Sequence, residues 1–142
     1  MATVTPQNSL IVEATVNAPI DKVWKLWNTP EDITKWNNAS DDWHSPRAKI
    51  DLTPGGKFNV RMEAKDGSAG FDFGGVYDKI TPQEYIAYTM GDGRKVEIHF
   101  TKSGSATNIV EKFEPENENT LELQQTGWQS ILDNFKKYAE TK

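Results

Sequence analysis

NTLELQQTGWQSILDNFKKYAETK, residues 119–142, carries the longest helical pattern in the chain. Asn119 and Glu122 have the spacing of a capping box, which predicts that a helix begins there. Apolar side chains recur along one face at the i, i+3, i+4, i+7 spacing, and they are Trp128, Ile131, Leu132, Phe135, Tyr138 and Ala139. Such a face must be covered by a partner, and the strand-like segments upstream supply a sheet.

Gly127 interrupts this helical pattern. A glycine inside a helix costs about 1 kcal/mol relative to alanine. We therefore expect close backbone packing, a kink or the approach of a ligand at Gly127.

The upstream sequence alternates apolar and polar residues with the period of strands that are buried on one side. Leu10–Asn17 is the first such segment, and Pro19–Trp36 then has the pattern of two short helices. Residues 37–46 are polar and are predicted to form a loop. Short turn segments that contain glycine separate roughly five or six further strands. Gly74-Gly75 predicts a bulge that changes which residues point inward.

Composition limits the classes of function. A chain of 142 residues is expected to form one domain, 1–142. Its net charge of −5 and the lack of a basic cluster argue against a nucleic-acid partner.

The absence of cysteine excludes disulfides, thiolate catalysis and cysteine-bound zinc. The N-terminal segment MATVTPQNSL has no leader pattern, and no segment approaches the ~18 apolar residues of a membrane span. We expect a cytoplasmic protein with no membrane partner.

Groups with catalytic chemistry are few. His44 and His99 are the two histidines, and neither has partners at the spacing of a metal site or a hydrolytic triad. Asp41, Asp42 and His44 form either a solvated loop or a metal or acid–base cluster at a pocket mouth. His99 alternates with apolar residues and is predicted to face solvent. We expect no metal, no cofactor and no catalytic residue.

Glu111 shares its strand face with Ile109 and Phe113. If these residues face inward, a carboxyl group is buried with them, and burial would raise its pKa and let it donate a hydrogen bond or move a proton. Alternatively the row faces out, or Glu111 pairs with a basic side chain such as Arg61. Alternation alone leaves these readings open.

Aromatic residues are more numerous than a small core between a sheet and a helix needs, which favours a cavity for a flat apolar molecule. The alternative is an aromatic core without a void. The candidate ligand-binding residues are Trp36, Trp43, Phe58, Phe71, Phe73, Tyr88, Phe100, Glu111, Gly127, Trp128, Ile131 and Phe135.

Several motifs together resemble one family. They are APIDKVWKLWNTPEDITKW (18–36), DLTPGGKF (51–58), GGVYDKITPQEYIAYT (74–89), VEKFEPE (110–116) and GWQSILDNFKKYAE (127–140). The chain resembles the START-like (SRPBCC) superfamily and, within it, small single-domain bacterial members of the family named after the activator of the heat-shock protein 90 ATPase. This resemblance implies an α+β helix-grip fold, in which a curved antiparallel sheet wraps around the long C-terminal helix.

We expect a binding module that holds a small hydrophobic or aromatic molecule between sheet and helix. The resemblance implies two alternatives: a co-chaperone that stimulates the heat-shock protein 90 ATPase in the stress response, and an enzyme of the polyketide cyclase or aromatase type. The first would add a heat-shock chaperone as partner. The second would use Glu111 or His44 with Tyr88 to handle protons. We expect a monomer or a weak homodimer.

Overall fold

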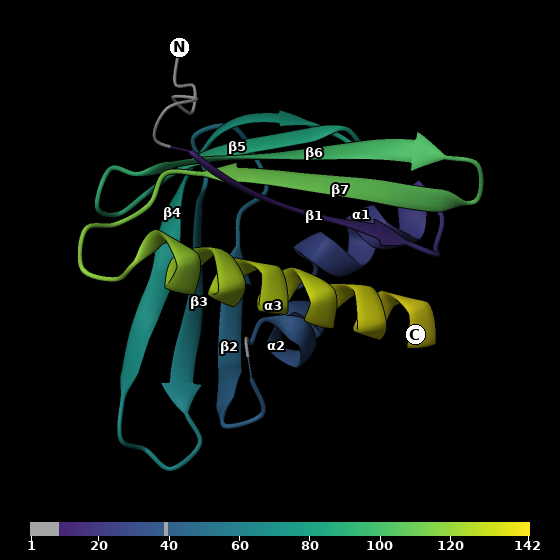
Figure 1. Ribbon diagram of the computed structural model, residues 1–142. Coiled ribbons are helices and arrows are strands. Elements are labelled where there is room, and N and C mark those ends of the chain that lie inside the picture. Colours follow the sequence, from purple (N-terminus) through teal and green to yellow (C-terminus); the bar gives the residue numbers. More distant parts are fainter. Residues whose placement is uncertain (1–8, 39) are drawn as a thin grey trace.

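Seven strands form one antiparallel sheet, and three helices accompany it (Figure 1). The computed structural model describes residues 9–38 and 40–142, so residues 1–8 of the N-terminal segment and Ala39 of the predicted loop lie outside the described part. In chain order the elements are β1 (Leu10–Val16), α1 (Ile20–Asn28), α2 (Pro30–Trp36), β2 (Trp43–Ile50), β3 (Lys57–Ala64), β4 (Gly70–Thr81), β5 (Tyr85–Met90), β6 (Lys95–Ser103), β7 (Ala106–Phe113) and α3 (Leu121–Thr141).

The strand order β1-β7-β6-β5-β4-β3-β2 brings the first strand beside the last and leaves β1 and β2 as the two edges. The sheet curls, and α3 runs along its inner side (Figure 1). The C-terminal half of α3 lies beside α1 and α2, whereas its N-terminal half lies in front of β3 and β4 (Figure 1). The α+β helix-grip fold expected from the sequence is confirmed.

The alternation along β3, β5 and β6 predicts their inward rows correctly. In β7, where alternation leaves the side open, the row of Thr107, Ile109, Glu111 and Phe113 is the buried one. On α3 the predicted apolar face packs against the core, with Leu132, Phe135 and Ala139 fully buried and Trp128, Ile131 and Tyr138 partly buried. The rows meet in one apolar cluster between sheet and helices.

The predicted loop 37–46 is wrong at its C-terminal end, because Trp43–Pro46 belong to β2. This strand is polar because it lies at a sheet edge and pairs on one side with β3. Pro46, which has no backbone N–H to donate, falls where the register shifts between His44 and Arg47. An edge strand of this composition gives little periodic signal.

The bulge predicted at Gly74-Gly75 is also wrong, because the register of β4 against β5 shifts between Tyr77 and Lys79. The two glycines instead permit close approach of neighbouring strands. A Cβ atom on Gly75 would lie 2.3 Å from the carbonyl oxygen of Thr89, and one on Gly74 would lie 2.7 Å from that of Phe58. Both distances are shorter than van der Waals contact allows.

The N-terminus of α3 differs from the predicted capping box. Thr120 is the N-cap, and its hydroxyl accepts a hydrogen bond of 3.1 Å from the backbone N–H of Leu123. The Asn119 side chain instead donates to the carboxylate of Glu116 at 2.6 Å. Close packing at Gly127 is also absent, since a Cβ atom built there meets nothing within 4 Å.

Candidate functional site

A cavity of about 330 Å³ lies between the sheet and the N-terminal half of α3. Its walls are the inward rows of β3, β4 and β5, single residues of β6 and β7, and side chains from all three helices. α1 and α2 lie beside the C-terminal half of α3, and β3 and β4 lie behind its N-terminal half (Figure 1). Most residues of the cavity wall come from β3, β4, β5 and α3, and α1 and α2 contribute others.

Aromatic rings in mutual contact form much of the wall. The ring of Phe58 on β3 lies 5.7 Å from that of Phe73, 5.1 Å from that of Tyr77 and 4.8 Å from that of Tyr88. From the helix side, the ring of Trp128 approaches Phe73 edge-on at 6.3 Å. These rings fix one another in position and present a rigid apolar surface.

The structure brings eight of the predicted ligand-binding residues to the cavity wall: Trp36, Phe58, Phe71, Phe73, Tyr88, Glu111, Trp128 and Ile131. They come from α2, from four strands and from α3. Residues far apart in the sequence thus meet around one space. Whether they contact a ligand stays a prediction.

Four predicted residues do not line the cavity. Phe100 packs against the rings of Trp24 and Trp27 at 5.3 and 5.6 Å, and Phe135 packs against Trp27 and Trp36 at 4.8 and 4.9 Å. Both therefore belong to the part of the core beside α1 and α2.

The other two are Trp43 and Gly127. Trp43 lies near the outer end of the sheet, where its ring is 6.0 Å from that of Phe71. Gly127 lies on α3 outside the cavity lining. Trp43 is a candidate as one of the many aromatic residues and Gly127 as a glycine inside a helix, and neither criterion fixes how far a cavity extends.

Glu111 is the buried ionisable group of this site. Its side chain points inward from the middle of β7, and only 6% of the residue is exposed. Burial raises the pKa of its carboxyl group from 4.5 to about 8. The pairing with Arg61 considered above does not occur, because the Arg61 guanidinium binds Glu63 at 2.9 Å and Asp72 at 3.7 Å. At neutral pH the Glu111 carboxyl is mainly protonated and is able to donate a hydrogen bond.

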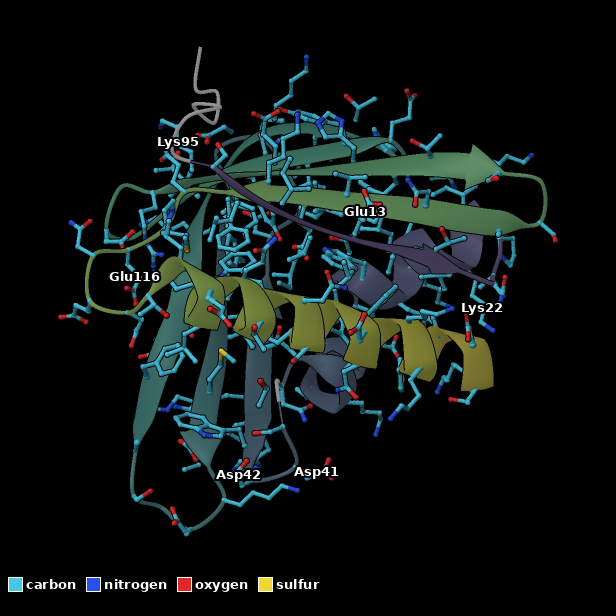
Figure 2. The ribbon with its side chains drawn as sticks, in the orientation of Figure 1. Glu13, Lys22, Asp41, Asp42, Lys95 and Glu116 are labelled. Carbon is cyan, nitrogen blue, oxygen red and sulfur yellow. The ribbon has the colours of Figure 1, made fainter. Side chains whose placement is uncertain are left out.

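Sequence reasoning missed several polar residues of the cavity wall, among them Arg94, Glu116 and Gln124. Glu116 lies on the loop that leads into α3 (Figure 2). Gln124 is buried and joins that loop to the helix, since its amide nitrogen donates to the carbonyl oxygens of Glu116 at 3.1 Å and Asn119 at 2.9 Å. Gln124 lies four residues before Trp128 and so on the apolar face of α3. This spacing could have identified it from the sequence. Arg94 and Glu116 are loop residues, and no periodicity predicts them.

The acidic segment before β2 lies elsewhere. Asp41 and Asp42 are at the tip of the molecule below α3, away from the loop that carries Glu116 (Figure 2). His44 is 42% exposed, and its Nε2 atom is 3.9 Å from a carboxylate oxygen of Glu63. His44 does not line the cavity, so of the two alternatives the metal or acid–base cluster at a pocket mouth does not apply to this cavity. His99 is 44% exposed, as expected for the outer face of β6.

No helix within residues 9–38 and 40–142 combines the length and the apolar character that crossing a membrane requires.

Two solved structures share substantial sequence with this chain. The AHSA1-like protein from Aeromonas hydrophila is 43% identical, with a TM-score of 0.88 over 94% of this chain and 92% of that one. A protein from Cytophaga hutchinsonii is 57% identical, with a TM-score of 0.82 over 94% of this chain and 93% of that one. A protein from Nitrosomonas europaea is 18% identical, with a TM-score of 0.82 and 99% coverage of both chains, and so shares the fold.

The search of curated proteins finds no match for this chain. The family model described as "Activator of Hsp90 ATPase homolog 1-like protein" matches residues 17–140, nearly the whole sequence. This match and the two structures above agree with the resemblance drawn from the sequence motifs. The chain belongs to the family of Activator of Hsp90 ATPase homolog 1-like proteins.

Proposed function

We propose that this protein binds a small hydrophobic or aromatic molecule in the cavity between its sheet and α3. The observation that carries the proposal is the cavity itself, about 330 Å³ in volume and walled by aromatic and aliphatic side chains. This volume lies at the lower end of the range of about 300–1,000 Å³ that is typical of small-molecule sites. A flat molecule of two or three fused rings matches its size.

Packing physics supports the proposal. Protein interiors are close-packed, and few voids exceed the size of a water molecule. Phe58, Tyr88 and Trp128 line this space, and contacts with other rings hold them in position around it. Trp128 in particular is stacked on Phe113, with ring centroids 4.0 Å apart and planes 8° from parallel. A ligand in the cavity would supply the van der Waals contacts that the side chains of the wall lack when the cavity is empty.

The family description favours a second candidate, stimulation of the heat-shock protein 90 ATPase as part of a stress response. This activity needs a surface that a chaperone recognises and does not need a cavity. The two candidates therefore respond differently to a substitution that fills the cavity.

The test uses two variants of α3 that introduce the same side chain. Ile131→Trp adds a large ring at the cavity wall, whereas Lys137→Trp adds it at an exposed position of the same helix. A panel of flat, neutral two- and three-ring compounds is titrated by calorimetry, and the melting temperature is recorded with and without each compound. A compound that binds only the folded state raises the melting temperature by mass action.

We expect at least one of these compounds to bind the wild type and Lys137→Trp with similar affinity and to bind Ile131→Trp at least about tenfold more weakly. The melting temperature of unliganded Ile131→Trp checks that the variant is folded. If no compound binds, and the protein stimulates the chaperone ATPase equally in all three forms, the co-chaperone candidate replaces the binding module.

A further inference from the structure

Three polar side chains line the cavity without a hydrogen-bond partner. Within the described residues, no hydrogen bond or ion pair joins the Glu111 carboxyl, the Tyr77 hydroxyl or the Tyr88 hydroxyl to another group, although all three residues line the cavity and are at least nine-tenths buried. The described part of the chain contains no fully enclosed polar atom that lacks a partner. The polar atoms of these groups are therefore accessible from the cavity. A ligand that fills the cavity and excludes water would leave them unpaired unless it bonds to them, so this arrangement favours a ligand with a polar group of its own.

The other charged groups of the wall already have partners. The Nε atom of Arg94 donates to the Asp92 carboxylate at 2.7 Å. The Glu116 carboxylate accepts hydrogen bonds from the backbone N–H groups of Glu118 and Asn119 at 2.9 and 2.7 Å. Besides the Tyr77 hydroxyl, Glu111 and Tyr88 remain unpaired, and these two lie close enough for the Glu111 charge to raise the pKa of Tyr88.

Glu111 and Tyr88 are both donors at neutral pH. Burial raises the pKa of Glu111 to about 8, and burial together with the nearby Glu111 raises that of Tyr88 well above 10. The remaining titratable or charged groups of the cavity wall are Tyr77 on β4, Arg94 before β6 and Glu116 before α3. Burial also raises the pKa of Tyr77, so this hydroxyl too keeps its proton.

We infer that the ligand carries a neutral hydrogen-bond acceptor, a carbonyl oxygen on an apolar and largely planar body, which accepts hydrogen bonds from the protonated Glu111 carboxyl and the Tyr88 hydroxyl. This inference rests on the function proposed above. A carbonyl oxygen has two lone pairs and so satisfies two donors that share one wall. The aromatic rings around it then cover the apolar body of the ligand.

A cationic amine fits these observations less well. It would require Glu111 to ionise inside an apolar space, and the attraction between two buried charges often fails to offset their loss of hydration. A carbonyl group needs no change of charge in the protein. The two ligand classes therefore predict opposite pH dependence, because a carbonyl ligand needs the protonated carboxyl and an amine needs the carboxylate.

The experiment compares fluorene, fluorenone and the fluorene amine in which an amino group replaces the carbonyl. The three share one ring system and differ at one position. Each is titrated by calorimetry against wild type, Glu111→Gln, Glu111→Leu and Tyr88→Phe, at pH values well below and well above 8. The glutamine amide keeps a neutral donor that does not titrate, whereas leucine removes the donor.

We expect the wild type below pH 8 to bind fluorenone about tenfold more tightly than fluorene, the value of one net hydrogen bond. This preference should decline as the pH rises through 8, persist at every pH in Glu111→Gln, and weaken in both Tyr88→Phe and Glu111→Leu, each of which removes one of the two donors. Fluorene binding should survive all three substitutions.

Different failures are distinguishable. If fluorene and fluorenone bind the wild type equally, or if Glu111→Leu keeps the full preference, the inference is wrong while the binding function stands. Tighter binding of the amine than of fluorenone below pH 8 also overturns it. If neither fluorene nor fluorenone binds the folded wild type, the proposed function fails for flat apolar molecules and the inference fails with it.

Discussion

Glu111 shows how one residue relates fold to site. A carboxyl group in the inward row of β7 is costly for the fold, because burial disfavours its charged form. Its neighbours in that row, Ile109 and Phe113, are completely buried and contribute to the core. A side chain that served only the core would be apolar at this position as well. The retained carboxyl group is thus a polar feature of the cavity rather than of the packing.

The first prediction concerns the effect of pH on stability through Glu111. In the unfolded chain this carboxyl releases its proton near pH 4.5, but in the folded protein it keeps the proton up to about pH 8. Its contribution to stability therefore falls as the pH rises from 4.5 to 8 and is constant above, a total of roughly 5 kcal/mol. Urea denaturation across this range should show the decline in the wild type, and Glu111→Gln should lack this component.

Glu63→Gln is the matched control for this prediction. Its hydrogen bond from Arg61 lowers the pKa of the Glu63 carboxyl, so its contribution has the opposite sign and is lost as the pH falls through the folded-state value. If Glu111→Gln and wild type have the same pH dependence between 4.5 and 8, Glu111 is not buried as described.

At the scale of elements, α3 has two functions along its length. Its C-terminal half closes the core through Phe135 and Ala139, both fully buried. Its N-terminal half presents Gln124, Trp128 and Ile131 to the cavity. Substitutions in the C-terminal half should therefore affect stability, and substitutions in the N-terminal half should affect binding.

Phe135→Ala should lower the free energy of unfolding by about 3–5 kcal/mol, because the removed ring is fully buried between Trp27 and Trp36 and leaves a void. Chemical denaturation measures this loss. A loss below about 1 kcal/mol would mean that the ring is not in the core and that the orientation assigned to α3 is wrong.

Gly127→Ala should stabilise the protein by about 0.5–1 kcal/mol. The added methyl group meets no atom within 4 Å, and alanine is the better helix former. Gly75→Ala is the contrasting variant, since its methyl group would lie 2.3 Å from the Thr89 carbonyl oxygen, and it should destabilise the fold. Denaturation midpoints of the two variants compare the effects, and a destabilised Gly127→Ala would indicate that α3 packs more closely there.

Sequence periodicity predicted the elements with a buried face and failed for those without one. The face of α3 and the inward rows of β3, β5 and β6 were predicted because each is long and packs against the core. The polar edge strand β2 was missed, since one partner strand and little burial leave a weak pattern. Alternation also placed Phe100 inward correctly and left open which side Glu111 faces, and three-dimensional curvature decides that the first meets α1 and the second meets the cavity.

At the scale of the whole molecule, the cavity results from combining a curled sheet with a straight helix. Phe100 against Trp24 and Phe135 against Trp27 fill one end of the core, whereas Phe58 and Phe73 meet beside the cavity, whose wall Trp27 and Trp36 also reach. Arg94 and Glu116 line the cavity from loops next to strand ends, which no local pattern predicts. The site is thus a property of the assembled fold, although most of its aromatic residues could be named from the sequence.

The most direct test of ligand binding in this cavity is the measurement of intermolecular nuclear Overhauser effects in a complex of the protein with fluorenone. We predict contacts from the ring protons of fluorenone to the methyl groups of Ile86, Ile98 and Ile131, which line the cavity from β5, β6 and α3. Contacts only to the exposed Ile11 and Val76, or no contacts at all, would contradict the proposal.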